Sequence, residues 1–434
     1  MNTFPLHGFR LETFSTSAAL KAFAILTAFT AFAVFSGPHA LARDIQVGQD
    51  CATIADAIKA ALPGDTIHLK PRVYREYAGF YAKKGLPGQP ITLDGHGATL
   101  EGADPLDPQQ WREVSPGLFA ADNLVPRLDD AILGRWFFLF AGQMNHMGRT
   151  SKGKSAAFKD PEDLSPGEWT FKKDPSREVS NSKQVFGSFF IRLEPGQSLE
   201  NARIEVPVRS GGVQMGGDNA HLVIRNITAT HPYNDGFNIH GDCRDVLFEN
   251  IRAIECGDDG ISAHESAQYR VVGFVSIGNS TGICDTGTSE TSYDGVFIRD
   301  CIGHDLFFPA TGRYVVKNAL ILSSAQQALS VSKSGPGDSC GVRLENVWLR
   351  RIGDLKDATV GADAVLEARN CTFENIQFRT VGALTLVNCI LNGKASATTS
   401  ATATTGAPGA DEAFLKRTID PEAGVVSIPS SLRR

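Results

Sequence analysis

The chain has 434 residues, of which 42% are hydrophobic and 21% charged, with 43 glycines and only 4 methionines. This composition excludes a compositionally disordered chain and favours many tight turns between short strands over a helical bundle. The formal net charge of −6 gives no electrostatic basis for binding nucleic acid.

The N-terminal segment 1–42 has the pattern of an export signal. Arg10 and Lys21 precede an apolar run over 22–35, and Ala40-Leu41-Ala42 has the small-x-small pattern of a signal-peptidase site. The run is too short to span a bilayer comfortably, and no other stretch reaches the roughly 18 apolar residues of a membrane helix. We expect 1–42 to be removed, which leaves 40 basic and 47 acidic residues in a secreted or periplasmic chain. An uncleaved membrane anchor is the alternative.

Residues 43–104 are predicted to form an N-terminal cap and the first coils of a solenoid. Apolar residues between Thr53 and Leu62 follow the spacing of one face of a short amphipathic helix, which ends at Pro63-Gly64-Asp65. Short alternating segments that follow predict strands separated by glycine-rich turns. A helix in this place would cover the apolar first coil of an open-ended stack.

Residues 105–200 interrupt this rhythm. They contain three of the four tryptophans, an apolar cluster at 136–140, and a polar basic loop around 148–154. We interpret the segment as an inserted β-rich subdomain. Its aromatic side chains are expected in a core rather than as platforms for sugar rings.

The clearest repeat lies within residues 201–393. Apolar segments ending in Asn or Asp recur at Leu222–Asn226, Val246–Asn250, Val296–Asp300, Val315–Asn318, Val342–Asn346 and Leu386–Asn388. Such units predict a coil that stacks parallel strands on its neighbours, with the asparagines stabilising turns. A leucine-rich solenoid is disfavoured, because no Leu-x-x-Leu-x-Leu frame is kept and the units lack a helix.

The end of the chain, 394–434, reads as a low-complexity linker and a C-terminal tail. The linker is rich in Ala, Thr, Ser and Gly, and the tail that begins at Asp411 is too short for a domain. We expect the tail to cap the open end of the solenoid or to extend into solvent.

All eight cysteines lie after residue 42, in a chain expected to meet an oxidising compartment. The sequence does not choose among their pairings. Cys301, Cys371 and Cys389 share a local frame after Asn or Asp, and we interpret these three as small buried apolar residues that stack.

An internal echo lies within residues 234–266. The segment Asn234–His240 is echoed by Asp258–His264, so that Asp235 is repeated by Asp259 and His240 by His264. Since neighbouring strands lie about 4.8 Å apart, aspartates on adjacent coils fall within reach of one another. Asp-Gly and Asn-Gly are also common turn formers, so a turn or a solvated face is the alternative for each residue.

Two features of the chain resemble the pectin-lyase-like superfamily. The helix followed by Pro-Gly-Asp-Thr and stacked coils is similar across most of 44–393, and implies a right-handed parallel β-helix. Asn234-Asp235-Gly236 and Gly257-Asp258-Asp259 resemble the aspartate motifs of polygalacturonase-like inverting glycoside hydrolases, where three aspartates act as acid and base. The chain has Gly260 where that pattern has a cysteine and lacks its downstream Arg-Ile-Lys, so pectin is not the expected substrate.

Glycoside hydrolysis needs one carboxylic acid and one carboxylate, which Asp235, Asp258 and Asp259 could supply. We expect Asp258 or Asp259 as the acid and Asp235 with the other as the base that positions water. The residues expected to bind the sugar are Asn234, Asn238, His240, His264, Glu265 and Arg270. No His-x-His or His-x-x-x-His spacing supports a metal, so no metal or cofactor is expected for this reaction.

Three hypotheses remain open. The first is an exported, monomeric glycoside hydrolase acting on a poly- or oligosaccharide. The second is a polysaccharide lyase or uronate epimerase, which would need His, Lys or Arg as base and often Ca²⁺ to neutralise the uronate. The third is a non-catalytic surface or adhesion protein that uses the solenoid as a rod.

Overall fold

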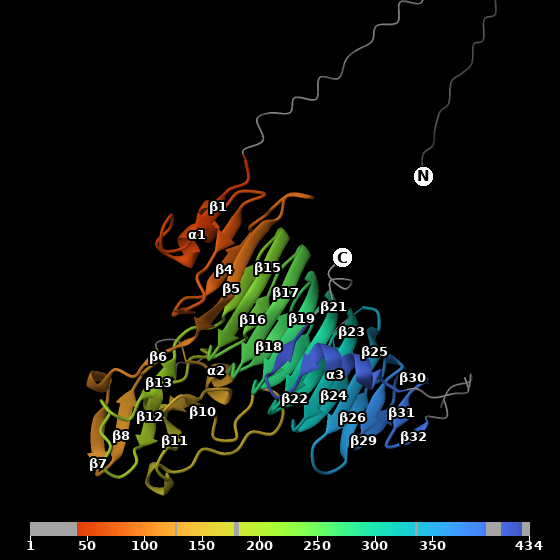
Figure 1. Ribbon diagram of the computed structural model, residues 1–434. Coiled ribbons are helices and arrows are strands. Elements are labelled where there is room, and N and C mark those ends of the chain that lie inside the picture. The colour runs from red at the N-terminus through yellow and green to blue at the C-terminus, as the bar shows by residue number, and fades with distance from the viewer. Residues whose placement is uncertain (1–40, 126–127, 178–181, 335–336, 396–408, 428–434) are drawn as a thin grey trace, which may run out of the picture. The chain divides into compact units, whose positions relative to one another are not determined.

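The computed structural model describes residues 41–125, 128–177, 182–334, 337–395 and 409–427 (Figure 1). Two extended sheets of mostly parallel strands alternate along the chain and form a parallel β-helix, which confirms the predicted fold class. The predicted signal peptide lies outside the described residues except for Leu41 and Ala42. No helix in the described ranges has the length and the apolar content that crossing a membrane requires.

One sheet is built from short strands and carries nine of them, all parallel. In spatial order they are β4 (Ala78–Tyr81), β14 (Val213–Gly216), β16 (Phe237–Ile239), β18 (Asp259–Ala263), β20 (Thr281–Asp285), β22 (His304–Phe308), β24 (Gln327–Val331), β26 (Lys356–Val360) and β29 (Ile376–Thr380). The register pairs Phe237 with Ile261 and Asn238 with Ser262, which is the internal echo seen in the sequence. We call this the short-strand sheet.

The second sheet has 15 strands and includes the longest ones, and we call it the long-strand sheet. It comprises β1 (Asp44–Gln46), β2 (Thr66–His68), β3 (Val73–Tyr74), β5 (Ile91–Glu101), β15 (Ala220–Thr230), β17 (Arg244–Ile254), β19 (Gln268–Ile277), β21 (Glu290–Arg299), β23 (Arg313–Ser323), β25 (Cys340–Arg351), β27 (Ala364–Arg369), β28 (Thr372–Glu374), β30 (Ala383–Val387), β31 (Ile390–Leu391) and β32 (Lys394–Ala395). Figure 1 shows β15, β17, β19, β21 and β23 side by side.

The asparagine column marks left-handed positions along this sheet. Asn226, Asn250, Asn318, Asn346 and Asn388 all have φ between 49° and 57°, a region that asparagine tolerates better than most residues. The Asn250 amide donates to the side-chain oxygen of Asn226 at 2.9 Å, and Asn346 donates to Asn318 at 2.8 Å. These side chains therefore stabilise left-handed bends, and all but Asn388 lie inside the long strands β15, β17, β23 and β25. The prediction that each strand ends at its asparagine was wrong at those four positions.

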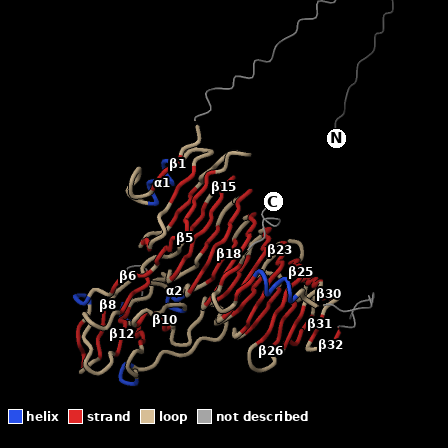
Figure 2. The backbone as a smooth tube through the Cα atoms, viewed as in Figure 1, coloured by secondary structure: helices blue, strands red, loops and turns tan. Residues whose placement is uncertain are grey.

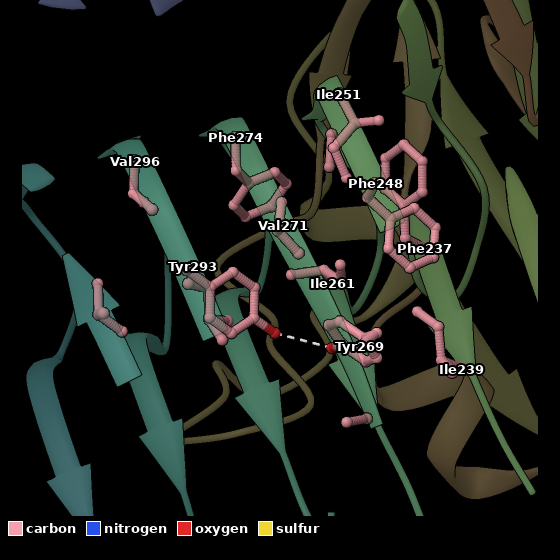
Figure 3. Close-up of a cluster of buried hydrophobic side chains, with 14 of the residues drawn as sticks. Phe237, Ile239, Phe248, Ile251, Ile261, Tyr269, Val271, Phe274, Tyr293 and Val296 are labelled. Carbon is pink, nitrogen blue, oxygen red and sulfur yellow. Dashed lines mark hydrogen bonds between the residues drawn. The ribbon is translucent and has the colours of Figure 1, made fainter. Parts of the chain in front are cut away.

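A continuous core fills the space between the two sheets. Figure 3 shows Phe237 and Ile261 of the short-strand sheet among Phe248 and Phe274 of the long-strand sheet, and all four are fully buried. Aromatic and branched residues on successive coils make each coil depend on its neighbours for burial.

The N-terminal helix α1 (Ile54–Ala60) is shorter than the predicted span. Thr53 caps it by accepting a hydrogen bond from the Asp56 amide at 3.0 Å. It ends because Ala61 is already extended. The helix contacts β4, the first strand of the short-strand sheet.

The segment 105–200 lies between two consecutive coils, because β5 pairs directly with β15 although the chain between them is long. Together with the flanking strands β6 (Ala103–Pro105) and β13 (Ile204–Pro207) it forms two antiparallel sheets. One contains β6, β9 (Phe138–Phe140), β10 (Gln143–Asn145) and β13, and the other contains β7 (Arg112–Ser115), β8 (Leu118–Asp122), β11 (Trp169–Lys173) and β12 (Gly187–Arg192). The short helix α2 (Asp130–Gly134) also belongs to it (Figure 2). Trp111, Trp136 and Trp169 are buried in its own core and are not sugar platforms.

The C-terminal arm, residues 409–427, differs from both expectations for the tail. It contains α3 (Glu412–Thr418), β33 (Ile419–Asp420) and β34 (Val425–Val426) and packs on the long-strand sheet. Its Leu415 and Ile419 cover Val275, Phe297 and Leu320, apolar residues of the sheet that would otherwise face water.

None of the eight cysteines, all within the described ranges, forms a disulfide. Cys301, Cys371 and Cys389 are buried, as the sequence predicted for this group. Burial raises the pKa of Cys301 well above its ordinary value, so this thiol behaves as a small apolar residue.

Candidate active site

Three aspartates gather at the N-terminal ends of two neighbouring strands of the short-strand sheet. Asp235 precedes β16, Asp258 precedes β18, and Asp259 is the first residue of β18. One carboxylate oxygen from each lies within 4.8 Å of the others, and the three residues are only 2 to 6% exposed. The structure thus confirms that adjacent coils bring the repeated aspartates together, and shows that they are covered.

The inserted subdomain supplies two cations to this cluster. The Lys152 ammonium lies 2.5 Å from Asp258 Oδ1 and 2.6 Å from Asp259 Oδ1. The Arg135 guanidinium donates to Asp258 Oδ2 at 2.7 Å, and the Ser151 hydroxyl donates to Asp258 Oδ1. Asp258 therefore receives two cations and a hydroxyl, Asp259 one cation, and Asp235 no direct ion pair among the described residues.

The covering loop, residues 148–155, holds Lys152 in this place. Thr150 Oγ1 lies 2.5 Å from Ser280 Oγ, and the Lys154 amide donates to the Gln326 side chain at 2.7 Å. A Cβ at Gly303 would overlap the Lys152 carbonyl, so glycine permits the close approach of the loop. The loop thus contacts several successive coils and covers the aspartates.

The three carboxyl groups differ in their tendency to ionise. Burial opposes the charge of Asp258, but Lys152 and Arg135 outweigh it and lower the pKa of Asp258 to about 2. Burial, and then the charge of Asp258, raise the pKa of Asp259 well above its ordinary value and raise the pKa of Asp235 as well. The cluster thus contains one carboxyl group that two cations keep ionised and two whose ionisation is opposed by burial and by the charge of Asp258.

Asp235 is held from within the short-strand sheet. Its Oδ1 accepts the Asp259 amide at 3.1 Å, and its Oδ2 lies 2.7 Å from the Ser262 hydroxyl. Ser262 is fully buried and its oxygen lies 3.1 Å from Nε2 of His264. The sequence echo predicted the aspartate but not the serine that supports it.

His240 and His264 stack on each other as the echo implied. Their ring centroids are 4.0 Å apart and the planes differ by 1°. His240 Nδ1 lies 3.1 Å from Glu265, which also accepts the Gly241 amide at 2.9 Å. Burial, and then the neighbouring His240, lower the pKa of His264 to about 4, so this imidazole is neutral at physiological pH.

The other predicted sugar-binding residues are less close to the cluster. Asn234 contributes its backbone carbonyl to the Asp258 amide at 3.1 Å, and Asn238 has a buried side-chain oxygen without a protein partner. Arg270 lies on β19 of the long-strand sheet, where it lines a separate surface groove with Val223 and Leu247. The structure does not bring Arg270 to the aspartates.

The carboxylate oxygens are also of the kind that bind divalent cations. The Lys152 ammonium already occupies the space beside two of them. The expectation that this chemistry needs no metal stays a prediction.

Sequence reasoning missed Lys152 and Arg135, which lie 106 and 123 residues before Asp258. A basic loop at 148–154 was visible, but nothing in the local pattern linked it to coils that follow much later in the chain. The one available signal was indirect, since clustered aspartates need cationic partners and the basic loop at 148–154 could supply them.

The chain matches no protein-family model and no curated protein sequence. Among solved structures, XylC in complex with xylose matches with 12% identity and a TM-score of 0.48, over 77% of this chain and 69% of that one. A structure described as a glycoside hydrolase matches with 8% identity and a TM-score of 0.45, over 90% and 100%. An alginate lyase from Paenibacillus sp. str. FPU-7 matches with 12% identity and a TM-score of 0.40, over 81% and 99%. Identities of 8–12% and TM-scores below 0.5 show no family for this chain.

Proposed function

We propose that the protein is an exported carbohydrate-active enzyme that hydrolyses a glycosidic bond of a poly- or oligosaccharide. The observation that carries the proposal is a group of three carboxyl groups within 4.8 Å of one another, in which two cations keep Asp258 ionised while burial raises the pKa of Asp259 and of Asp235. Because two cations face three carboxyl groups, we assign one proton to the Asp235–Asp259 pair. Such a division supplies a base and an acid at the same pH.

The roles follow from the contacts of each carboxyl group. Asp258, paired with two cations, acts as the carboxylate that attacks the sugar or activates water. The proton of the Asp235–Asp259 pair goes to the leaving oxygen. Asp235 thus falls on the acid side, in contrast to the role of base expected for it from sequence. The short carboxyl separation resembles the roughly 5–5.5 Å of retaining enzymes more than the wider inverting range.

Substrate must displace Lys152 to reach these groups, because its ammonium contacts both Asp258 and Asp259. The covering loop therefore opens, at least around Lys152, when a glycan binds. Loops that close over a reacting sugar exclude water and complete the site, which fits a loop placed across the mouth of this one.

A screen of purified mature protein against a glycan panel tests the proposal. We expect cleavage that is abolished by Asp258→Asn and by Asp259→Asn and reduced by Asp235→Asn, while Asp242→Asn, an exposed aspartate paired with Arg244, keeps full activity. Full activity in all three cluster variants on a cleaved glycan would falsify the hydrolase assignment.

A lyase is the second candidate, and neutral His264 near the Lys152 cation is the observation that favours it. A lyase product absorbs in the ultraviolet because it carries a new double bond, and a hydrolase product does not. Lys152 is poorly suited as the lyase base, since Asp258 and Asp259 outweigh its burial and raise its pKa well above the ordinary value. Absence of cleavage on every glycan would favour a non-catalytic solenoid.

A further inference from the structure

Four side chains form an unbroken line of hydrogen-bonding atoms from the aspartate cluster to the partly exposed edge of the next coil. Asp235 Oδ2 lies 2.7 Å from Ser262 Oγ, and Ser262 Oγ lies 3.1 Å from His264 Nε2. On the other side of the ring, His264 Nδ1 lies 3.2 Å from Thr286 Oγ1. Thr286 Oγ1 also lies 3.2 Å from the Ala263 carbonyl.

This line is satisfied in two proton arrangements. With Asp235 ionised, Ser262 donates to Asp235, His264 donates from Nε2 to Ser262, and Thr286 donates to Nδ1. With Asp235 protonated, every donor reverses, and Thr286 donates to the Ala263 carbonyl instead. The imidazole is neutral in both arrangements and differs only in which nitrogen carries the proton.

The charged groups around Asp235 favour proton transfer along this line over direct proton exchange with solvent on the side of the covering loop. The titratable and charged groups that face Asp235 are Lys152, Arg135, Asp258, Asp259 and Cys256. Those that face His264 are His240, Glu265, Lys152 and Asp258. On the covered side the cluster meets the loop cations, whereas His264 and Thr286 remain partly exposed.

We propose that Thr286, His264 and Ser262 form a proton relay that loads and unloads Asp235 while the covering loop or a bound glycan seals the cluster. The relay rests on the proposed function for its purpose, because an acid that gives its proton to a leaving group must be reprotonated in each turnover. His264 is then a positioning and proton-carrying residue rather than a contact for the sugar.

Each proton in the transfer has a donor and an acceptor. Thr286 gives its hydroxyl proton to His264 Nδ1 and takes another from water. His264 gives its Nε2 proton to Ser262, and Ser262 gives its own to Asp235. Asp235 gains one proton, the ring ends neutral with its proton on Nδ1, and the water molecule has lost one. The reverse sequence unloads Asp235.

The direct test is nitrogen NMR of the full mature chain with ¹⁵N-labelled histidine, read across about pH 5 to about pH 9, above the value at which His264 charges. The His264 signals are assigned by their loss in His264→Gln. We expect the ring proton to move from Nδ1 to Nε2 as Asp235 ionises, without a charged ring. The switch should be absent in Asp235→Asn.

Two serine variants and a control separate a relay from a merely structural contact. Ser262→Ala removes the bridging hydroxyl and should abolish the switch, whereas Ser262→Thr keeps a hydroxyl and should retain it. Ser266→Ala is the matched control, since that hydroxyl bonds Asp242 outside the line. A ring that keeps one tautomer throughout in the wild type, or a switch that persists in Ser262→Ala, overturns the proposal.

The kinetic arm keeps the two proposals distinguishable. On any glycan that the wild type cleaves, Ser262→Ala should lower kcat about tenfold, leave KM unchanged and increase the solvent deuterium isotope effect. An unchanged kcat and isotope effect on a cleaved glycan contradict the relay. If no glycan is cleaved, the hydrolase fails, and the tautomer switch still decides whether the relay exists.

Discussion

Replacing Lys152 by methionine removes the ammonium that contacts Asp258 and Asp259 and keeps much of the side-chain volume. The expected loss of folding stability follows from these contacts. Lys152 and Arg135 together lower the pKa of Asp258 from its ordinary 3.8 to about 2. At 1.36 kcal/mol per pKa unit this interaction stabilises the folded state by about 2 kcal/mol. Stranding a buried partner brings the expected cost of Lys152→Met to about 3–5 kcal/mol.

The stability difference between the wild type and Lys152→Met should depend on pH in a definite direction. A carboxyl with a lowered pKa stabilises the fold fully above its unfolded pKa, and that share is lost as the pH falls from about 4 to about 2. Without Lys152 the clustered carboxyl groups take up protons on folding, so the stability of the variant rises as the pH falls from neutrality. The difference between wild type and variant is therefore largest at neutral and alkaline pH and shrinks on acidification.

Thermal unfolding followed by circular dichroism at a series of pH values measures this difference. Lys154→Met is the matched control, because the backbone of this neighbouring exposed lysine, and not its ammonium, contacts Gln326. Adding Asp259→Asn to Lys152→Met should recover part of the loss. Equal destabilisation at acidic and neutral pH, or none at all, would refute the electrostatic reasoning.

Three further predictions use other parts of the chain. Burial opposes the charge of His231, but hydrogen bonds to two glutamates outweigh it and raise its pKa to about 9. We therefore expect His231→Asn to be less stable than the wild type below about pH 6.5, and this difference to disappear as the pH rises through 9. Unfolding experiments at a series of pH values measure the difference. Burial raises the pKa of Asp305 from 3.8 to about 7, so the stability of the wild type falls as the pH rises from about 4 to about 7. In Asp305→Asn this fall should be smaller by roughly 4 kcal/mol, which unfolding midpoints at a series of pH values measure. Removal of residues 409–434 should expose apolar residues of the long-strand sheet. Binding of a hydrophobic dye should then increase, and light scattering should detect self-association. Unchanged dye binding and scattering would contradict the packing of the arm on this sheet.

The fold was predictable because every coil repeats the same local physics. Apolar residues at Leu222, Val246 and Val342 recur before asparagines that accept a left-handed turn, and such a pattern carries strand, turn and neighbour in one short segment. The C-terminal arm was not predictable in this way, because its partner surface is a row of outward-facing residues from several strands. No local period in the arm indicates where that surface lies.

The aspartates were predictable for the same reason as the fold. The regular repeat places Asp235 and Asp259 on adjacent coils, and strand spacing then fixes their proximity. Their ionisation was not predictable, because it depends on Lys152 and Arg135 from the inserted segment. The sequence placed those residues in a separate β-rich region, and only the return of the chain to the β-helix brings them to Asp258.

The position of the covering loop affects the proton affinity of the aspartates through the charge of Lys152. While Lys152 contacts Asp258 and Asp259, two cations balance two carboxylates. When Lys152 leaves, Arg135 alone remains against three carboxyl groups, and their proton affinity rises. In the proposed reaction, opening of the loop would therefore favour uptake of a further proton as a glycan enters. In that reaction the glycan would cover the cluster on the side of the loop, and the proposed relay through Ser262 and His264 would give the proton a path to the partly exposed part of the coil.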